Sequence, residues 1–233
     1  MVAQKLTTSF DQIQEFCNSH QLTINIGKTQ LMVMKTANRK LPEDFQLTLD
    51  GIAIKPLSSV KILGVTIDQH LTMGEHIDKV VKKGNGLLGA LVRASPFLPR
   101  QLLRMAYISL VRTHLEYCSA LLHPAAKTHL KKLDIIQKKA ARIIYGVPRT
   151  AHAAPLLEAL NLQYLGDRRR SHISGLVEAM IAERCHPAFI DLFEVESDGK
   201  ITTNFTPRLR IGAKRFTVTG PAIYNESRHT TGV

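Results

Sequence analysis

Hydrophobic residues follow a helical period at the start of the chain and an alternating period after it. Leu6, Phe10, Ile13 and Cys17 recur at helical spacing, which predicts an amphipathic opening helix with one buried face. Between residues 31 and 67 the period changes to two, which predicts a succession of short strands. The alternating runs are LMVMK, QLTL, IAI and VKILGVTI.

A turn signal separates two of these strands. Asp50 and Gly51 lie between the triplets LTL and IAI. This dipeptide tolerates the positive φ values that a two-residue hairpin loop requires. The sequence therefore predicts an antiparallel hairpin here.

Helical periodicity dominates the chain from Asp68 to about Phe193. Beyond Glu194 the residues are rich in Thr, Gly and Arg with weak periodicity, so we expect a loosely ordered basic tail over 194–233. The predicted fold class is α+β, with one helix and short antiparallel strands over 1–70 and a mainly α-helical bundle over 71–193. Prolines separate the predicted helices, which cover residues 74–94, 99–122, 126–145, 155–160 and 164–184.

The charge of the chain indicates an acidic partner. The 233 residues contain 31 Lys and Arg against 19 Asp and Glu, which gives a net charge of +12. Much of this charge is concentrated between residues 127 and 170, a segment that contains ten basic and three acidic residues. With 44% hydrophobic residues the chain can also bury a core, which excludes disorder throughout.

Targeting and redox signals are weak. The chain has no run of 18 apolar residues, and its first ten residues lack the apolar block of a signal peptide. We therefore expect an intracellular protein, cytoplasmic or nuclear, with no membrane association. Cys17, Cys118 and Cys185 are odd in number and far apart, so we expect reduced, mostly buried thiols.

Acidic residues give little support for a metal site. Glu43 and Asp44 form the only adjacent acidic pair, but they follow a proline in a polar connector, which favours a solvated loop. Asp68 ends a predicted strand and could face a pocket, although capping of the next segment is the commoner role. A nuclease of ribonuclease H type would have to use acids that do not fall on central strands: Asp50, Asp68, Glu75 and Asp78.

Histidines, serines and glycines match no catalytic motif. His114, His123 and His129 flank Cys118, but their spacing is not that of a zinc site. There is no G-x-S-x-G elbow and no phosphate-binding P-loop. We therefore predict neither a metal ion nor another cofactor in this chain.

Basic side chains on the predicted helices give the clearest indication of function. Several Lys and Arg residues along packed helices can neutralise successive phosphates of a nucleic acid. The alternative is a solvated helix face, and for Lys28, in a turn before a strand, an ordinary surface position. The candidate nucleic-acid-binding residues are Lys82, Lys83, Lys131, Lys132, Lys138, Lys139 and Arg142.

Four sequence motifs follow one another along the chain. Residues 22–29 have the form L-x-x-N-x-x-K-T, residues 60–68 contain K-x-L-G-x-x-I-D, and residues 136–144 contain Q-K-x-A-A-R-x-I. Residues 220–225 have the form G-P-x-x-W-N, with Tyr224 in place of Trp. Together these motifs resemble the C-terminal part of the reverse transcriptase of a non-LTR (LINE-type, jockey-like) retrotransposon.

The resemblance implies different roles for different segments of the chain. Residues 1–70 would form the end of the polymerase palm, and residues 71–193 would form its thumb. Lys28 would lie near the leaving pyrophosphate as an auxiliary catalytic residue, and the strand over residues 60–68 would grip the primer end through Leu63 and Gly64. The helices between residues 74 and 145 would hold the RNA template and the RNA–DNA hybrid.

The resemblance also implies what the chain lacks. In such enzymes the aromatic-x-Asp-Asp loop that binds Mg²⁺ lies upstream of the part that this chain matches, and the fingers lie earlier still. The chain alone is therefore expected to be inactive as an RNA-directed DNA polymerase, and to require the upstream palm and fingers of the same polyprotein. The alternative is a non-enzymatic nucleic-acid-binding or domesticated interaction protein.

Overall fold

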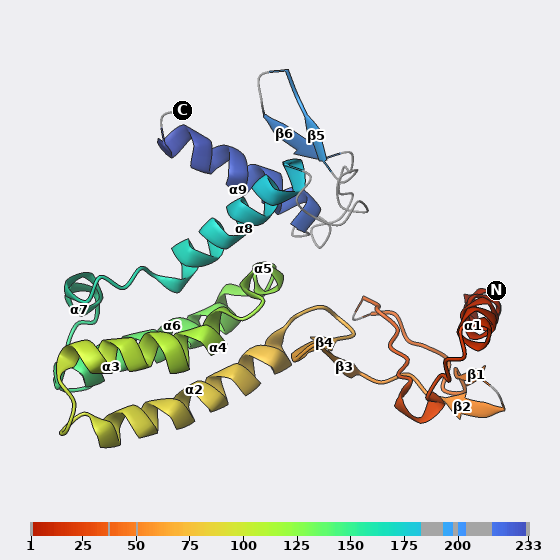
Figure 1. Ribbon diagram of the computed structural model, residues 1–233, viewed down its shortest axis with the longest axis horizontal. Helices are drawn as coiled ribbons and strands as arrows, with labels where there is room; N and C mark the ends of the chain where they lie inside the picture. Colours follow the sequence, from red (N-terminus) through yellow and green to blue (C-terminus); the bar gives the residue numbers. More distant parts are fainter. Residues whose placement is uncertain are drawn as a thin grey trace. The chain divides into compact units, whose positions relative to one another are not determined.

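The computed structural model describes residues 2–36, 38–49, 51–182, 193–197, 200–203 and 216–231 (Figure 1). Helices and short antiparallel strand pairs make up these parts, which confirms the α+β class. The chain divides into two compact units, residues 1–76 and residues 77–233. Asp50 and Cys185, which the sequence analysis singled out, lie outside the described residues.

The first unit begins with the predicted helix, α1 (Val2–Ser19). The expectation of a buried face is wrong, because Leu6 and Ile13 are 40% and 55% exposed. The thiol-bearing Cys17 on the same face is only half-buried. The reason is that α1 packs against the three-residue strand β1 (Leu47–Leu49), which covers only part of the helix.

The segment after α1 is less regular than predicted. A 3₁₀ turn, η1 (Ile26–Lys28), is capped by Asn25, whose Oδ1 accepts a hydrogen bond of 3.2 Å from the Lys28 amide. The strand expected from residue 31 does not form, because this extended segment pairs at separate points only. The Leu31 carbonyl accepts from the Leu57 amide, and the Lys35 amide donates to the Gln69 carbonyl.

The predicted hairpin is confirmed. Strand β1 pairs with β2 (Ile52–Ile54) in antiparallel register, with Leu47 opposite Ile54. Gly51 has a φ of 76°, the left-handed conformation that this loop requires. Leu47 and Leu49 are buried, so β1 supplies part of the small core of this unit.

A second hairpin replaces the single strand expected over residues 60–68. Strand β3 (Ser59–Ile62) pairs with β4 (Val65–Asp68), and Leu63 and Gly64 form the loop between them. Both loop residues have positive φ, 47° and 88°, which reverses the chain in two residues. The sequence does not indicate this turn, because leucine rarely adopts the left-handed backbone conformation.

Asp68 organises the turn that leads from β4 into the next helix, which confirms the capping role. Its carboxylate accepts hydrogen bonds from the amides of His70, Thr72 and Met73, at 3.0, 3.1 and 2.8 Å, and from the Thr72 hydroxyl at 3.0 Å. Burial raises the pKa of Asp68, but these four hydrogen bonds outweigh it and hold the pKa below its usual value. Both oxygens of the carboxylate therefore have a structural role in this turn.

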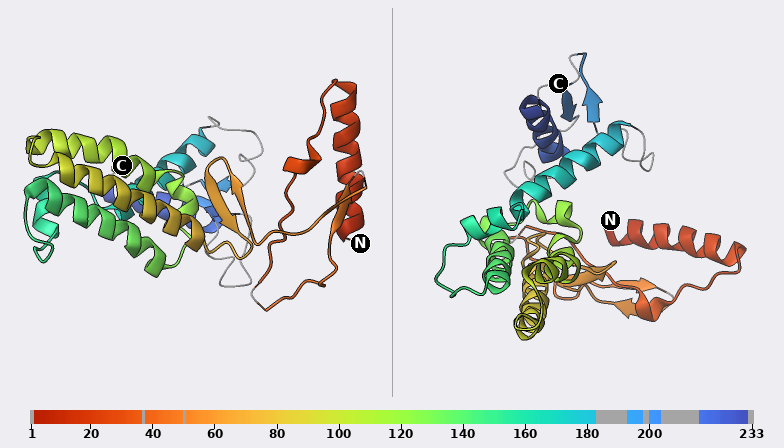
Figure 2. Two further views of the ribbon diagram at one scale, coloured as in Figure 1. Left: turned by 90° about the horizontal axis from the view of Figure 1, so that it is seen from below. Right: turned by 60° about the vertical axis from the view of Figure 1, so that its left-hand side comes forward.

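The second unit contains the predicted helical bundle. Figure 2 shows α2 (Gly74–Ala94), α3 (Arg100–Ala106) and α6 (Lys127–Tyr145) side by side. The predicted helix over residues 99–122 is divided: α3 continues through a π-helical segment, η2 (Tyr107–Arg112), into α4 (Thr113–Glu116), and α5 (Ser119–Leu122) follows a left-handed Cys118. Fully buried side chains from these helices form the core, including Tyr107, Leu115, Leu133 and Ile136.

The remaining predicted helices are α7 (Ala154–Ala159) and α8 (Leu165–Ile181). Parts of the region beyond residue 194, which we expected to be loosely ordered, form regular elements in the described residues. These elements are the hairpin of β5 (Phe193–Val195) and β6 (Ile201–Thr203), and α9 (Phe216–Thr231), which packs on α8.

A side-chain contact explains how this last region is held. The Asn225 amide on α9 accepts from the Ile201 N–H at 3.1 Å and donates to the Ile201 carbonyl at 2.8 Å, so it completes the hydrogen bonding of β6. Gly220 and Pro221 within α9 weaken the helical signal of its sequence. The G-P-x-x-W-N motif is thus a helix segment that ends in a structural asparagine.

Candidate nucleic-acid interface

Helices α2 and α6 meet along a line of paired polar side chains. The Lys132 Nζ lies 2.5 Å from the Asp78 Oδ1, and the Lys139 Nζ donates to the Asn85 Oδ1 at 3.1 Å. The second pair lies later than the first on both helices, so α2 and α6 run in the same direction. Lys82 lies between Asp78 and Asn85 on the same stripe of α2, because the three are spaced i, i+4, i+7.

Two glycines on α2 differ in their surroundings. A Cβ on Gly84 would lie 3.2 Å from the Ile136 Cγ2 of α6, so glycine permits the close approach of the helices. A Cβ on Gly86 would meet no atom within 4 Å. Gly86 is exposed and lies four residues after Lys82, so the surface beside this lysine is open.

Two of the predicted binding lysines bond to α2, and the other four are exposed lysines of α2 and α6. Lys82, Lys83, Lys131 and Lys138 are exposed. Lys132 and Lys139 contact α2 through Asp78 and Asn85. We refer to these six residues as the α2–α6 lysines.

Arg142 has a structural role. Its Nε donates to the Ala151 carbonyl at 2.7 Å, which holds the loop after α6. Within the same motif the buried Gln137 donates to the Gln163 carbonyl at 2.9 Å, and Ala140 and Ala141 are fully buried. The Q-K-x-A-A-R-x-I motif therefore builds the core and the loop, while Lys138 is exposed and Lys139 donates to Asn85 of α2.

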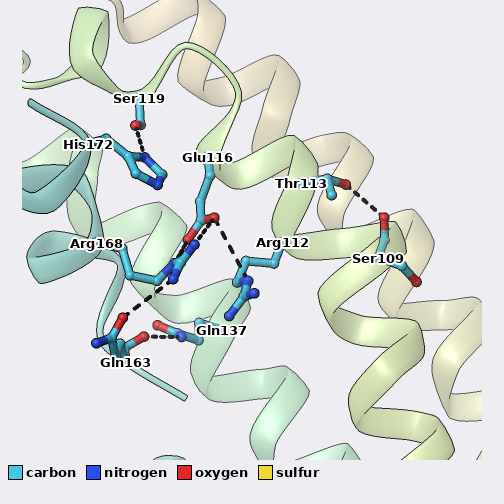
Figure 3. A network of polar contacts seen from close by, with 9 residues as sticks. All are labelled: Ser109, Arg112, Thr113, Glu116, Ser119, Gln137, Gln163, Arg168 and His172. Carbon is cyan, nitrogen blue, oxygen red and sulfur yellow. Dashed lines mark hydrogen bonds and ion pairs between the residues drawn. The ribbon is translucent and has the colours of Figure 1, made fainter. Parts of the chain in front are cut away.

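A charged network that the sequence pattern does not indicate links α4 to α8 (Figure 3). Glu116 accepts hydrogen bonds from Nε and Nη2 of Arg168, and the Arg112 Nε lies 3.8 Å from its Oε2. The Arg168 Nη1 also donates to the Gln163 Oε1 at 3.4 Å. The hydrogen bond to Glu116 raises the pKa of Arg168. The sequence shows Arg168 only as part of the basic cluster, because its partner lies 52 residues away.

The π-helical segment lies beside this network. Tyr107 begins it and is fully buried, and burial raises the pKa of its hydroxyl. The Ser109 Oγ donates to the Met105 carbonyl at 2.9 Å. The Thr113 Oγ1 donates to the Ser109 carbonyl, also at 2.9 Å (Figure 3). These side chains occupy backbone acceptors where the regular α-helical bonding is interrupted.

The residues expected at the catalytic end belong to the first unit. Lys28 is exposed at the end of η1. Leu63 is 87% exposed at the tip of the β3–β4 hairpin, and Gly64 follows it in the loop. An apolar side chain this exposed in a left-handed conformation is unfavourable for stability.

The described acids do not fit a Mg²⁺ site. Among the residues that the structure describes, no three His, Cys, Asp or Glu side chains lie close enough to hold a metal ion. Asp68 is bonded within its turn, Asp78 pairs with Lys132, and Glu116 pairs with Arg168. Glu43 and Asp44 are exposed in the predicted loop, where the Phe45 amide closes a turn onto the Pro42 carbonyl.

The histidines that the sequence analysis considered are on or beside helices, as expected. His114 and His129 are half-buried, and His123 lines a pocket at the start of α6. The described helices also lack the properties of a membrane span, since none is both long and apolar enough to cross a bilayer.

Three curated relatives are similar to this chain. The RNA-directed DNA polymerase from mobile element jockey of Drosophila funebris is 29% identical over 69% of the chain and 18% of its own length. The jockey polymerase of Drosophila melanogaster is 27% identical over 73% of the chain and 19% of its own length. The probable RNA-directed DNA polymerase from transposon BS of Drosophila melanogaster is 24% identical over 80% of the chain and 21% of its own length.

The chain therefore spans about a fifth of the length of the curated relatives it matches. No family model matches the chain, and no solved structure gives a significant match. The sequence motifs and the three relatives agree on one class of protein. The chain is related to a part of the RNA-directed DNA polymerases of non-LTR retrotransposons.

Proposed function

We propose that this chain is the part of a retrotransposon RNA-directed DNA polymerase that holds the template and primer. The α2–α6 lysines contact the backbone of the RNA–DNA hybrid. The observation that carries this proposal is the exposure of Lys82, Lys83, Lys131 and Lys138 on two helices that pack closely at Gly84. The activity of the relatives supplies the class of ligand.

The arrangement suits a sugar–phosphate backbone. Contacts from Lys to phosphates position a duplex without reading its sequence, as a polymerase requires. The close packing of α2 on α6 at Gly84 and Ile136 keeps the two rows of lysines at a constant separation, and the exposed Lys132–Asp78 and Lys139–Asn85 contacts lie beside it. The open surface at Gly86 lets a bulky strand approach α2 beside Lys82.

The first unit contributes to the primer end in this proposal. Leu63 and Gly64, at the exposed tip of the β3–β4 hairpin, contact the 3′ end of the primer. Lys28 assists departure of pyrophosphate as a general acid. The carboxylates that hold Mg²⁺ belong to other parts of the enzyme, and Mg²⁺ supplies there the charge stabilisation of nucleotide transfer. On this basis the chain by itself binds nucleic acid but does not extend a primer.

The test measures how salt weakens binding of an RNA–DNA hybrid. In the variant, Lys82, Lys131 and Lys138 are changed to Gln, which keeps helix propensity and removes three charges. Lys139 and Arg142 are left intact because they bond within the fold. The slope of log affinity against log salt should flatten by roughly 0.7 to 0.9 for each phosphate that is no longer neutralised.

A matched control separates this surface from net charge. Lys5, Lys40 and Lys55 are exposed lysines of the first unit, and their change to Gln removes the same charge. The control should leave the slope close to that of the unmodified chain. Equal slopes in the two triple variants would show that the α2–α6 lysines are only a solvated face.

A further inference from the structure

A pocket with a cavity volume of about 350 Å³ lies where α6 begins, on the second unit. Its lining includes His123 and the two residues after it, and Lys127 and Leu130 of α6. Gly166, Arg169 and Arg170 of α8 and Thr219 of α9 complete it. The pocket thus gathers His123, Lys127, Arg169 and Arg170, with no acidic side chain among its lining residues in the described part of the chain.

The first turn of α6 adds positive potential to this pocket. Its N-cap is Ala126, which has no side chain to accept from the first amides, and the first turn contains no acidic residue. The partial positive charge of the helix N-terminus is therefore left without a local anion. Lys127, the first residue of the helix, adds a full charge instead.

Arg169 provides an independent sign that a ligand is missing. It is only 6% exposed, and within the described residues its Nε has no hydrogen-bond partner. Burial lowers the pKa of Arg169, while Asp134 and Glu116 act in the opposite direction. A buried guanidinium N–H without an acceptor costs free energy of folding. The position of Arg169 in the lining of a pocket therefore favours a bound anion as the missing acceptor.

The neighbouring groups show the same excess of positive charge. Burial lowers the pKa of His123, and Arg169 and Arg170 lower it further. Arg170 contacts Glu226 at 3.3 Å, but both side chains are largely exposed, so this pair is weak. Burial raises the pKa of Asp134, the acid whose charge acts on Arg169, and Arg169 itself lowers that pKa.

We propose that this pocket binds a phosphate dianion, either inorganic phosphate or the terminal phosphate of a nucleic-acid strand. The second source rests on the proposed function, and the first does not. Three permanent cations, a histidine and a helix N-terminus match a doubly charged monoester better than a singly charged phosphodiester. The Nε of Arg169 donates to a phosphate oxygen, and Lys127 and Arg170 supply the outer cations.

Gly166 offers a test that does not disturb these cations. A Cβ there would meet no atom within 4 Å, and the residue lines the pocket, so a leucine side chain extends into open space. Gly175 on the same helix is equally open but does not line the pocket. Gly166→Leu should therefore block the pocket, and Gly175→Leu is the matched control.

The experiment titrates the full chain with inorganic phosphate by calorimetry, at constant ionic strength in chloride. The unmodified chain and Gly175→Leu should bind with equal affinity, and Gly166→Leu should bind about tenfold more weakly or not at all. Lys127→Gln, a change of one exposed side chain, should give a smaller loss. Absence of saturable phosphate binding, or equal binding by Gly166→Leu and Gly175→Leu, would overturn the proposal.

A second titration distinguishes the two sources of phosphate. It compares one oligonucleotide with a 5′-phosphate and with a 5′-hydroxyl. A gain from the 5′-phosphate that Gly166→Leu abolishes identifies the strand end as the ligand. Phosphate binding without such a gain identifies the free anion, and both results support the pocket.

The two proposals fail separately. The Lys82, Lys131 and Lys138 variant should retain its affinity for inorganic phosphate, because none of these residues lines the pocket. Gly166→Leu should retain the salt slope for the hybrid that depends on the α2–α6 lysines. If the chain binds phosphate but the lysine substitutions leave the salt slope for the hybrid unchanged, the pocket proposal stands and the hybrid-holding function is wrong.

Discussion

Glu116 on α4 and Arg168 on α8 form a two-pronged ion pair, in which both Nε and Nη2 of the guanidinium donate to the carboxylate (Figure 3). Both side chains are largely buried. Because α4 and α8 are far apart in sequence, this pair joins the first and second halves of the helical bundle. Its geometry is specific to arginine, since lysine cannot present two parallel N–H groups.

Changing Arg168 to Met should therefore destabilise the bundle. Methionine keeps much of the apolar contact but leaves the buried Glu116 with Arg112 alone, at 3.8 Å. We expect a loss of about 1–3 kcal/mol in the free energy of unfolding, measured by urea denaturation. Arg170→Met is the control, because its exposed pair with Glu226 should contribute less than about 0.5 kcal/mol. Equal losses would show that the Glu116 pair is no stronger than a surface contact.

Alanine should have opposite effects at two neighbouring glycines of α2. At Gly86 a Cβ meets no atom, so Gly86→Ala should stabilise the helix by about 0.5–1 kcal/mol. At Gly84 the Cβ would press on Ile136 at 3.2 Å, which offsets the gain in helix propensity. Thermal unfolding should rank Gly86→Ala above the unmodified chain and Gly84→Ala below Gly86→Ala. The reverse order would contradict the packing of α2 on α6.

Asp68 should make the first unit sensitive to acid. Its pKa is lowered in the folded chain, so its stabilising effect is complete above the unfolded value of 3.8 and is lost as the pH falls through the folded pKa. Asp68→Ala should cost about 1 kcal/mol at neutral pH, as the loss of a helix cap does. Urea unfolding at decreasing pH should show this difference shrinking below pH 3.8. Asp44→Ala, in an exposed turn, should have no such effect.

Leu63 should show a conflict between stability and function. Leu63→Asn produces an Asn-Gly loop, which suits two consecutive positive φ values, so the hairpin should gain about 1 kcal/mol. If Leu63 contacts the primer end, the same change should weaken primer extension by the complete enzyme. Thermal unfolding and extension assays measure the two effects. A variant that is more stable and equally active would remove Leu63 from the proposed primer contact.

Lys28 is tested in an enzyme restored by fusion to the upstream polymerase sequence. Lys28→Ala should lower the rate of the chemical step by ~10² to 10⁴ if the lysine is a general acid, with little change in template affinity. Lys40→Ala, another exposed lysine of the first unit, is the control. Single-turnover kinetics separate the two effects. Equal rates would return Lys28 to the role of a turn residue.

Local sequence patterns are sufficient to predict most of the helices. The 3.6-residue period and the flanking prolines place α2 at the predicted bounds, and α6 begins one residue after the predicted start. The Asp-Gly signal likewise predicts the β1–β2 hairpin. These elements are predictable because their apolar stripes and their turns are encoded by adjacent residues.

Other features depend on contacts that the sequence does not display. The Leu63–Gly64 loop has an unfavourable residue at its first position, so the sequence does not indicate its turn. The α9 helix has weak periodicity, and its contacts with β6 through Asn225 bridge 24 residues. The pocket at the start of α6 depends on Arg169, which is buried by the packing of α8. The sequence does not single this residue out, because it is the middle one of three consecutive arginines.

The paired contacts between α2 and α6 restrict how chains that keep this helix pair can vary in length. Asp78 and Asn85 are seven residues apart, as are their partners Lys132 and Lys139. One inserted or deleted residue on either helix would rotate every later side chain by about 100° and separate the second pair. Length changes should instead fall in the loops that precede and follow these helices. Homologous polymerases should therefore align without gaps between residues 78 and 85 and between residues 132 and 139.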